Sequence, residues 1–421
     1  MFGKKRPEAL VVGAGPVGLF AALQLTKRGI RVEIIDKDWR TGAHSYALAL
    51  HPPSLRLLAD LGLLEDVLDQ AYVVQSIGIY DRCELKAEIR ALSGSDSVGL
   101  VAVLQQDALE SLLEEGLKSR GIKVQWNHEL ADLQATPTGN RVTIDHLIKE
   151  TVGYAVARTE WTIGKTASMD VPFVIGADGH RSTVRRRMGI EFSAVGPAQH
   201  FAVFECVTNA DLGHEMKIVL ANGTANVLWP MNDGRCRWSF QLTDVEAPPQ
   251  ARTKDRLSLR IGMSEFPVLS EESFERFLED RAPWFDAAVE EIAWSIVVPF
   301  EYRLAERFGT QGAWLVGDAG HTTGPVGMHS MNVGFREARD LARAISGVLK
   351  GGEPREGLQA YTAARIEEWN HLLGLEQDFF PGRSADPWIG DHRDQLIPCL
   401  PATGDELRKM AGQLCLEPAR G

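Results

Sequence analysis

A strand, a glycine-rich turn, a helix and a second strand follow one another within the first 36 residues, and this order constrains the fold more than any other feature. Residues 9–12 form an apolar run typical of a buried parallel strand, and an apolar helix is expected from the glycines to about Arg28. Residues 31–36 are the next strand, which ends on a carboxylate. The arrangement predicts a dinucleotide-binding unit in an α/β protein with a parallel sheet.

The glycines of this turn, Gly13, Gly15 and Gly18, have distinct expected tasks. Gly13 allows the tight turn, Gly15 lets the backbone approach a pyrophosphate, and Gly18 lets the helix pack on the strand. Asp36 follows about 20 residues later, where a carboxylate can bind the ribose hydroxyls of an adenosine. A glycine-rich turn without a ligand would not explain this combination, but the loop alone does not separate FAD from NAD.

A second strand–loop–helix segment lies about 300 residues further on, at residues 314–340. A short apolar strand at 314–316 runs into Gly317 and Asp318, a loop rich in Gly and Pro follows, and a helix is expected to begin near Ser330. Backbone N–H groups point outward at a helix N-terminus, and the helix dipole adds about half a positive charge. A reduced flavin is negative at one edge of its ring, and this segment is suited to that edge.

A third segment completes a recognisable set. Residues 171–177 form an apolar strand that leads into Asp178 and Gly179, with Arg185 beyond. With the glycine loop and Asp36, the DG motif at Asp178–Gly179 and the GD motif at Gly317–Asp318, the chain resembles the class A flavoprotein monooxygenases, the group of para-hydroxybenzoate hydroxylase, from about residue 8 to 350. The resemblance implies a Rossmann-like FAD-binding domain and a second α+β domain built on an antiparallel sheet, with C-terminal helices.

The resemblance also implies which residues hold the cofactor. The glycine loop would line the pyrophosphate, Asp318 would contact the ribityl chain, and the DG region would serve both FAD and NAD(P)H. Arg40 looks like the basic residue that often follows the second strand, and Gln106 resembles the family's polar residue near the ribityl chain. The expected cofactor-binding residues are Gly13, Ala14, Gly15, Pro16, Val17, Gly18, Asp36, Lys37, Arg40, Gln106, Asp178, Asp318, Pro325, Gly327, Met328, Met331 and Asn332.

Two departures from the family pattern bear on the flavin. Residues 327–332 read Gly-Met-His-Ser-Met-Asn, where the family often has a Gly-Gly-Gln-Gly-like run before the Asn, so we expect different contacts to the ring. Tyr46 stands where many members carry an Arg, in a region that supports a flavin moving between two positions. The route by which NAD(P)H reaches the flavin is therefore left open.

The activity that the resemblance implies is oxygen insertion. NAD(P)H, bound transiently, would reduce FAD, O2 would add to give a C4a-hydroperoxyflavin, and its distal oxygen would hydroxylate an aromatic or polycyclic small molecule. Such chemistry needs no metal and no nucleophilic serine. His321, His329 and His44 are candidate bases because histidine titrates near neutral pH, although hydrogen-bonded loop histidines are commoner.

Several alternatives use the same cofactor. The hydroperoxide could serve epoxidation or Baeyer–Villiger-type insertion, or the chain could be a flavin-dependent reductase or dehydrogenase without oxygen insertion. A halogenase is disfavoured because residues 294–299 match its Trp-x-Trp-x-Ile-Pro signature only in part. A flavin-binding sensor without turnover belongs to another class, and oxygen-dependent consumption of NAD(P)H would exclude it.

Composition limits the partners and the compartment. The net charge of −12 argues against a nucleic-acid partner. Five cysteines without a CxxC pair are typical of reduced thiols, and no apolar stretch is long enough to span a bilayer. Residues 4–6 imitate the start of a secretory signal, but the nucleotide-loop glycines interrupt the apolar run that follows. We expect a cytoplasmic enzyme, monomeric or homodimeric, that binds O2 and a small aromatic substrate.

The predicted secondary structure changes between about residues 197 and 300. Asn222-Gly223 and Asp233-Gly234 are strong hairpin signals and predict an antiparallel sheet. Its aromatic residues either pack on helices or, for a subset, line a substrate pocket; they are Phe201, Phe204, Trp229, Trp238 and Phe240.

This change in predicted secondary structure suggests domain boundaries. We expect an FAD-binding domain in two parts, 1–196 and 301–350, around a substrate-binding domain at 197–300, to which 75–100 are a candidate addition. Residues 266–293 read as mostly helical, with a strand at 294–299. A C-terminal helical segment at 351–421 would contain helices near 357–373 and 403–414 with a Pro-containing loop between them, and no thioredoxin-like domain.

Overall fold

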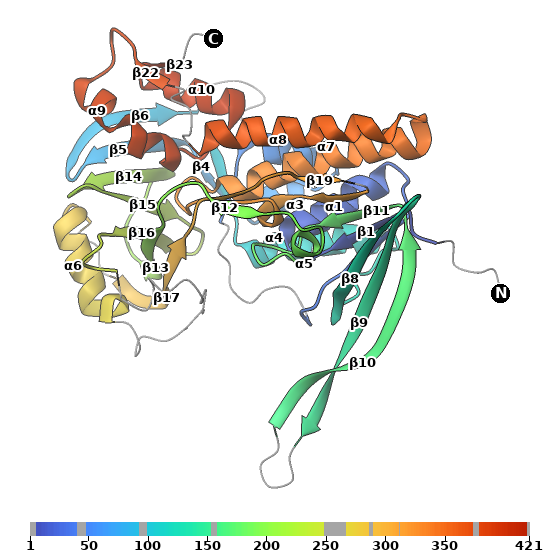
Figure 1. The fold of residues 1–421 in the computed structure, drawn as a ribbon. Coiled ribbons are helices and arrows are strands. Elements are labelled where there is room, and N and C mark those ends of the chain that lie inside the picture. The colour runs from blue at the N-terminus through green and yellow to red at the C-terminus, as the bar shows by residue number, and fades with distance from the viewer. Residues whose placement is uncertain are drawn as a thin grey trace.

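The computed structural model describes residues 6–39, 48–91, 99–152, 158–247, 267–285, 289–310, 312–373 and 379–418. Figure 1 shows two sheet-containing parts side by side and a long arm of strands that projects away from one of them. The mixed α/β architecture predicted from the sequence is confirmed, because one of these sheets is mainly parallel and the other mainly antiparallel.

The central sheet has the order β19-β20-β11-β1-β2, and all of its pairs are parallel except that of the edge strand β19. The first strand is buried at every position, as its uninterrupted apolar run predicts. The strands are β1 (Ala9–Val12), β2 (Val32–Ile35), β11 (Phe173–Gly176), β20 (Ala313–Leu315) and β19 (Gly309–Thr310).

Two helices pack together against this sheet. Helix α1 (Pro16–Lys27) begins with a proline, whose missing N–H costs nothing in the first turn, and α7 (His329–Gly351) lies beside it with Phe335 stacked 4.5 Å from Phe20. The helix expected near Ser330 therefore begins one residue earlier. The other helices of this part are α2 (Pro52–Ala59), α3 (Leu64–Leu68), α4 (Gln106–Ser119), α5 (Thr183–Arg187) and α8 (Gln359–Leu372).

The second sheet has the order β17-β13-β16-β15-β14-β5-β6, and only β14 and β5 pair in parallel. Asn222 and Asp233 adopt positive φ before Gly223 and Gly234, so both predicted hairpin turns are confirmed. The strands are β5 (Ser76–Asp81), β6 (Glu84–Arg90), β13 (Gln199–Thr208), β14 (Glu215–Ala221), β15 (Thr224–Pro230), β16 (Arg235–Leu242) and β17 (Val289–Phe300).

The aromatic residues of this sheet separate onto two faces. Phe204, Trp238 and Phe240 pack against helix α6 (Glu271–Arg281) in one apolar cluster. Phe201 and Trp229 lie on the opposite face in a different cluster. Alternate side chains of a strand point to opposite faces, so neighbouring positions of β13 serve two separate cores.

Two expectations about helices were wrong. The helix expected over 266–293 is confined to α6, because Pro283 follows its end and residues from Val289 onward pair with β13 as part of β17. The loop expected between the last two helices contains α9 (Pro387–Leu396), whose N-cap Asp386 accepts a hydrogen bond from Trp388 N. The last helix is α10 (Gly404–Gln413).

A three-stranded antiparallel sheet in the order β10-β9-β8 forms the projecting arm seen in Figure 1. It comprises β8 (His128–Thr136), β9 (Gly139–Val152) and β10 (Arg158–Val171). The remaining strands are short: β3 (Ala49–Leu50), β4 (Tyr72–Val74), β7 (Val101–Val103), β12 (Phe192–Ala194), β18 (Arg303–Ala305), β21 (His321–Thr322), β22 (Phe379–Pro381) and β23 (Leu416–Pro418). In the part of the chain that the structure describes, no helix has the length and apolar character needed to cross a membrane.

Candidate cofactor-binding site

Three loops that are far apart in the sequence meet at the carboxyl end of the central sheet. Strands β1, β11 and β20 are parallel neighbours, so the glycine loop, the DG motif and the GD motif all leave the sheet at the same edge. Ala177 N donates to Val12 O and Val316 N donates to Gly176 O, which extends the pairing up to the motifs. Ligands of open parallel sheets bind at this edge.

The glycine loop combines closely packed positions with an open one. Gly13 has a φ of 106°, and a Cβ added there would lie 2.2 Å from Ala177 O, while a Cβ on Gly18 would lie 2.0 Å from Gly13 O. At Gly15 an added Cβ would meet nothing within 4 Å. Gly13 and Gly18 are therefore required by close packing and Gly15 faces open space, at the N-terminus of a helix with no side-chain cap and no acidic residue in its first turn.

Asp36 lies at the end of β2, beside this loop. Its carboxylate accepts hydrogen bonds from Ala14 N at 2.6 Å and from Asp38 N at 2.8 Å. Burial raises the pKa of Asp36, although these two N–H groups work in the opposite direction. The carboxylate is thus fixed next to the first turn of α1, and Lys37 beside it is exposed.

In the DG motif, Asp178 holds its own loop. Its carboxylate accepts hydrogen bonds from Ser182 Oγ at 2.5 Å, Thr183 N at 2.6 Å and Val184 N at 3.1 Å, and so caps α5. Arg185 extends the connection, because its guanidinium donates to His180 O and to Ala319 O in the GD motif. The two motifs are joined by this arginine.

In the GD motif, Asp318 is exposed between the buried residues Gly317 and Ala319. The surrounding protein nevertheless desolvates its carboxyl group and raises its pKa, and His321 and His180 oppose this effect. Since Asp318 is accessible to solvent beside two other motif loops, it is placed to contact a ligand.

Glu337 of α7 supports the GD motif from within the protein and was not expected from the sequence. It accepts hydrogen bonds from Gly317 N at 2.7 Å and Trp369 Nε1 at 2.9 Å, and its Oε2 lies 3.0 Å from His321 Nε2. Burial opposes ionisation of Glu337, but His321 and Arg365 outweigh it and the pKa is lowered. No local sequence pattern marks this role, because the partners are 16 to 32 residues away.

The side chain of Asn332 is committed to the protein interior. Its Oδ1 accepts hydrogen bonds from His51 N and Ser54 Oγ, and its Nδ2 donates to Ala49 O and Met328 O. Asn332 therefore ties the segment before α2 to the start of α7. The resemblance places residues 325–332 along the flavin ring, and we call this segment the predicted flavin loop. Within it, Met328 has a φ of 53°, and Gly327 packs so closely against Pro398 O that a Cβ there would lie 2.4 Å away.

Pro325 and Met331 complete the predicted flavin loop. Pro325 is partly buried, and Met331 is buried in the core of the central sheet.

The candidate histidines are structural in character. His321 is buried against Glu337 and stacks 3.8 Å from Trp369. His329 is buried with its Nε2 2.8 Å from Leu400 O, and burial lowers its pKa to about 4. His44, like Arg40 and Tyr46, lies outside the described residues.

Gln106 is the first residue of α4, and its Nε2 donates to Glu110 Oε1 at 2.8 Å. Its neighbour Gln105 donates to Glu205 Oε1 of the antiparallel sheet at 3.0 Å, and Glu205 forms a buried ion pair with Arg237 at 2.7 Å. This network joins the start of α4 to the second sheet. Its residues are distant in the sequence, so sequence patterns did not predict it.

Comparison with known proteins places the chain in a family. A model described as FAD binding domain matches residues 6–372, which are most of the chain. The chain belongs to this FAD-binding family. Its members among the relatives described below are aromatic monooxygenases, in agreement with the class A resemblance.

The relatives define the likeness more closely. The 6-methylpretetramide 4-monooxygenase of Streptomyces rimosus is 29% identical over 87% of this chain, which spans only 60% of that relative. The p-nitrophenol 4-monooxygenase of Pseudomonas putida DLL-E4 has the same fold, with a TM-score of 0.70, 21% identity and 99% of each chain covered. Aklavinone-11 hydroxylase, solved with FAD and aklavinone, has a TM-score of 0.61 and 19% identity, with 88% of this chain and 66% of that chain covered.

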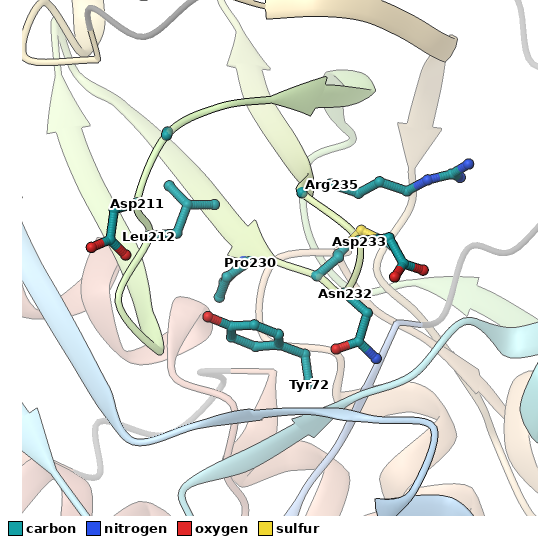
Figure 2. Close-up of a pocket in the computed structure, with 10 residues that line it drawn as sticks. Tyr72, Asp211, Leu212, Pro230, Asn232, Asp233 and Arg235 are labelled. Carbon is teal, nitrogen blue, oxygen red and sulfur yellow. The ribbon is translucent and has the colours of Figure 1, made fainter.

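A cavity of about 220 Å³ opens at the end of the antiparallel sheet of this FAD-binding protein. Figure 2 shows Tyr72 beside Pro230 and Asn232, whereas the Arg235 side chain points away from Tyr72. The Arg235 guanidinium lies 3.4 Å from Glu205, the residue that also accepts from Gln105. Among the described residues, no three His, Cys, Asp or Glu side chains gather as metal ligands.

Proposed function

We propose that the chain is an FAD-dependent monooxygenase that uses NAD(P)H and O2 to hydroxylate an aromatic or polycyclic small molecule. The family assignment, the three motif loops at one sheet edge and the open space at Gly15 support FAD as the cofactor. The activity is proposed for this chain because it spans 60% and 66% of the length of two of its curated relatives.

One observation carries the hydroxylase assignment. Val326 and Met328 of the predicted flavin loop belong to the same apolar cluster as Phe201 and Trp229 of the antiparallel sheet. The loop expected along the flavin ring therefore shares one apolar core with an aromatic sheet face that comes from another part of the chain. Ligand sites are commonly apolar and lie where such parts meet.

The residues of the chain have separable tasks in this proposal. FAD would supply the redox and oxygen chemistry. The glycine loop and the N-terminus of α1 would bind its phosphates, and Asp36 and Asp318 would bind its hydroxyl groups. The face with Phe201 and Trp229 would orient an aromatic ring and exclude water. The two candidate histidines that the structure describes, His321 and His329, are hydrogen-bonded and buried, so we assign no general base.

The proposal has alternatives that use the same site. Epoxidation or Baeyer–Villiger-type insertion would use the same oxygen chemistry on a different substrate, and a reductase would not insert oxygen. We favour hydroxylation because the relatives are named for monooxygenation of aromatic compounds.

A cytoplasmic location is proposed from the cysteines. All five are free, including the buried pair Cys206 and Cys236, whose sulfur atoms lie 3.4 Å apart. The protein is proposed to act as a monomer or homodimer.

The test combines reduction with product analysis. NADPH and then NADH are added without oxygen to the FAD-loaded protein, and the flavin absorbance is followed. Oxygen and candidate aromatic compounds are then supplied, and products are analysed by mass spectrometry. Bleaching followed by a product heavier by one oxygen atom supports a monooxygenase, and a new hydroxyl group in that product supports hydroxylation over epoxidation or Baeyer–Villiger-type insertion. Bleaching with an unoxygenated product would identify a reductase, and failure to bleach would point to a separate reductase partner.

A further inference from the structure

We propose that Trp39, Lys149 and Trp161 form a docking surface for the adenine and phosphate groups of the pyridine nucleotide. This inference rests on the NAD(P)H use proposed above. It concerns the outer face of the projecting arm, which the cofactor-binding site described above does not include.

The three side chains form one assembled surface. The Lys149 ammonium lies 5.3 Å from the centre of the Trp39 ring and 5.0 Å from that of Trp161, so one cation lies close to two indoles. Both indoles are exposed, Trp39 to 53% and Trp161 to 44%. No described carboxylate forms an ion pair with Lys149, so its charge is available to an anion.

The backbone fixes these residues next to the nucleotide end of the central sheet. Trp39 follows Asp36 at the carboxyl end of β2, and Trp161 pairs directly with Lys149 across the arm. The arm is joined to this segment because His128 N donates to Asp36 O and Asn127 N donates to Asp38 O, both at 2.8 Å. The surface therefore lies at the sheet edge where nucleotides bind.

The chemistry of the surface matches an adenine nucleotide. An exposed indole offers a face on which a purine can stack, and the ammonium can pair with a phosphate. The net charge of −12 makes the chain as a whole unfavourable for a polyanion, so a local cation matters. Only one dinucleotide loop is present in the sequence, so a reducing nucleotide must bind without a Rossmann unit of its own.

The experiment measures nucleotide affinity in the FAD-loaded protein. 2′,5′-ADP and 5′-ADP are titrated by calorimetry, and the dissociation constants of NADPH and NADH are obtained from anaerobic flavin bleaching. The variants are Trp161→Ala, Trp161→Phe and Lys149→Gln. Phe380→Ala serves as the matched control, since Phe380 is an aromatic residue of β22 exposed to 42%.

We expect Trp161→Ala to weaken binding of all four probes roughly tenfold, the typical loss of one stacked base. Trp161→Phe should recover part of this loss, and Lys149→Gln should weaken 2′,5′-ADP and 5′-ADP. Phe380→Ala should leave the affinities for all four probes unchanged. The bleaching rate at saturating nucleotide should stay unchanged, because the surface binds the nucleotide and takes no part in hydride transfer.

Three results would overturn the proposal: unchanged affinities in Trp161→Ala, a loss of bound FAD in that variant, or a change only in oligomeric state. Loss of FAD would assign the surface to the adenine of FAD, and a changed oligomeric state would assign it to a second copy of the chain. Failure of the proposed function is tested separately with dithionite-reduced protein, oxygen and an aromatic compound. If ADP binding depends on Trp161 but no oxygenated product forms, the docking surface stands and the hydroxylase assignment falls.

Discussion

Glu337 accepts a hydrogen bond from the backbone N–H of Gly317 at 2.7 Å, so helix α7 holds the GD motif from within the protein. The same carboxylate binds the Trp369 indole and lies against His321. One buried group thus fixes the geometry of a loop whose neighbouring residue, Asp318, faces outward.

Glu337→Gln replaces one acceptor oxygen with an amide NH2 that faces other donors. We expect a loss of stability on the order of 1–3 kcal/mol, together with weaker FAD retention, because a buried donor is left without a partner. Denaturant unfolding of the apoprotein measures the first effect and flavin content the second. Glu306→Gln, which removes a surface ion pair with Arg307, is the control, and equal effects in the two variants would refute the role of Glu337.

Asp318→Ala should sharply lower the amount of FAD that remains bound after gel filtration, while the melting temperature of the apoprotein changes little. Asp318 is exposed, so its loss leaves no unpaired group in the core. Asp405→Ala, at an exposed ion pair on α10, should retain the flavin. A fully flavin-loaded Asp318→Ala protein would contradict the assignment of the GD motif.

Gly15→Val should empty the cofactor site without unfolding the protein. A Cβ at Gly15 meets no atom within 4 Å, so the valine is accommodated in the free protein and occupies the space expected for the pyrophosphate. Flavin absorbance shows whether the cofactor site is empty, and circular dichroism shows whether the protein is still folded. Gly412→Val, at another glycine whose Cβ would meet nothing within 4 Å, is the matched control and should stay yellow.

Protonation of His329 should make stability depend on pH. Burial lowers its folded pKa to about 4 from the ordinary value of 6.5, so between these values the unfolded chain binds more protons than the folded one. The free energy of unfolding should therefore fall as the pH drops from 6.5 toward 4, by on the order of 3 kcal/mol for this group. His329→Gln should reduce the slope of stability against pH in this range, and an unchanged slope would contradict the role of this group.

Local patterns were sufficient to predict much of the fold. Gly13 adopts a positive φ and Gly18 packs on Gly13 O within the same turn, and Asn222-Gly223 fixes a hairpin by its own backbone preference. The family assignment then confirmed that the chain contains an FAD-binding domain.

Long-range contacts were beyond such patterns. Asn332 was expected among the cofactor-binding residues, but the hydrogen bonds that its side chain accepts from His51 and Ser54, 281 and 278 residues away, have no local signal in the sequence. The Gln105–Glu205 hydrogen bond spans 100 residues, and no local signal marks either partner. The expected helix beyond Ala282 failed because pairing with β13 outweighed local helical preference.

The division of the antiparallel sheet into two faces has a consequence for how such a protein can change over generations. On β13, Phe204 packs beneath α6, and its neighbours in the chain, Val203 and Glu205, face the other way. Residues that hold the protein together therefore alternate with residues that face the predicted flavin loop. Substitutions in the set that faces the predicted flavin loop can adapt a lineage to a new substrate. The other set, one position away, meanwhile keeps the protein folded.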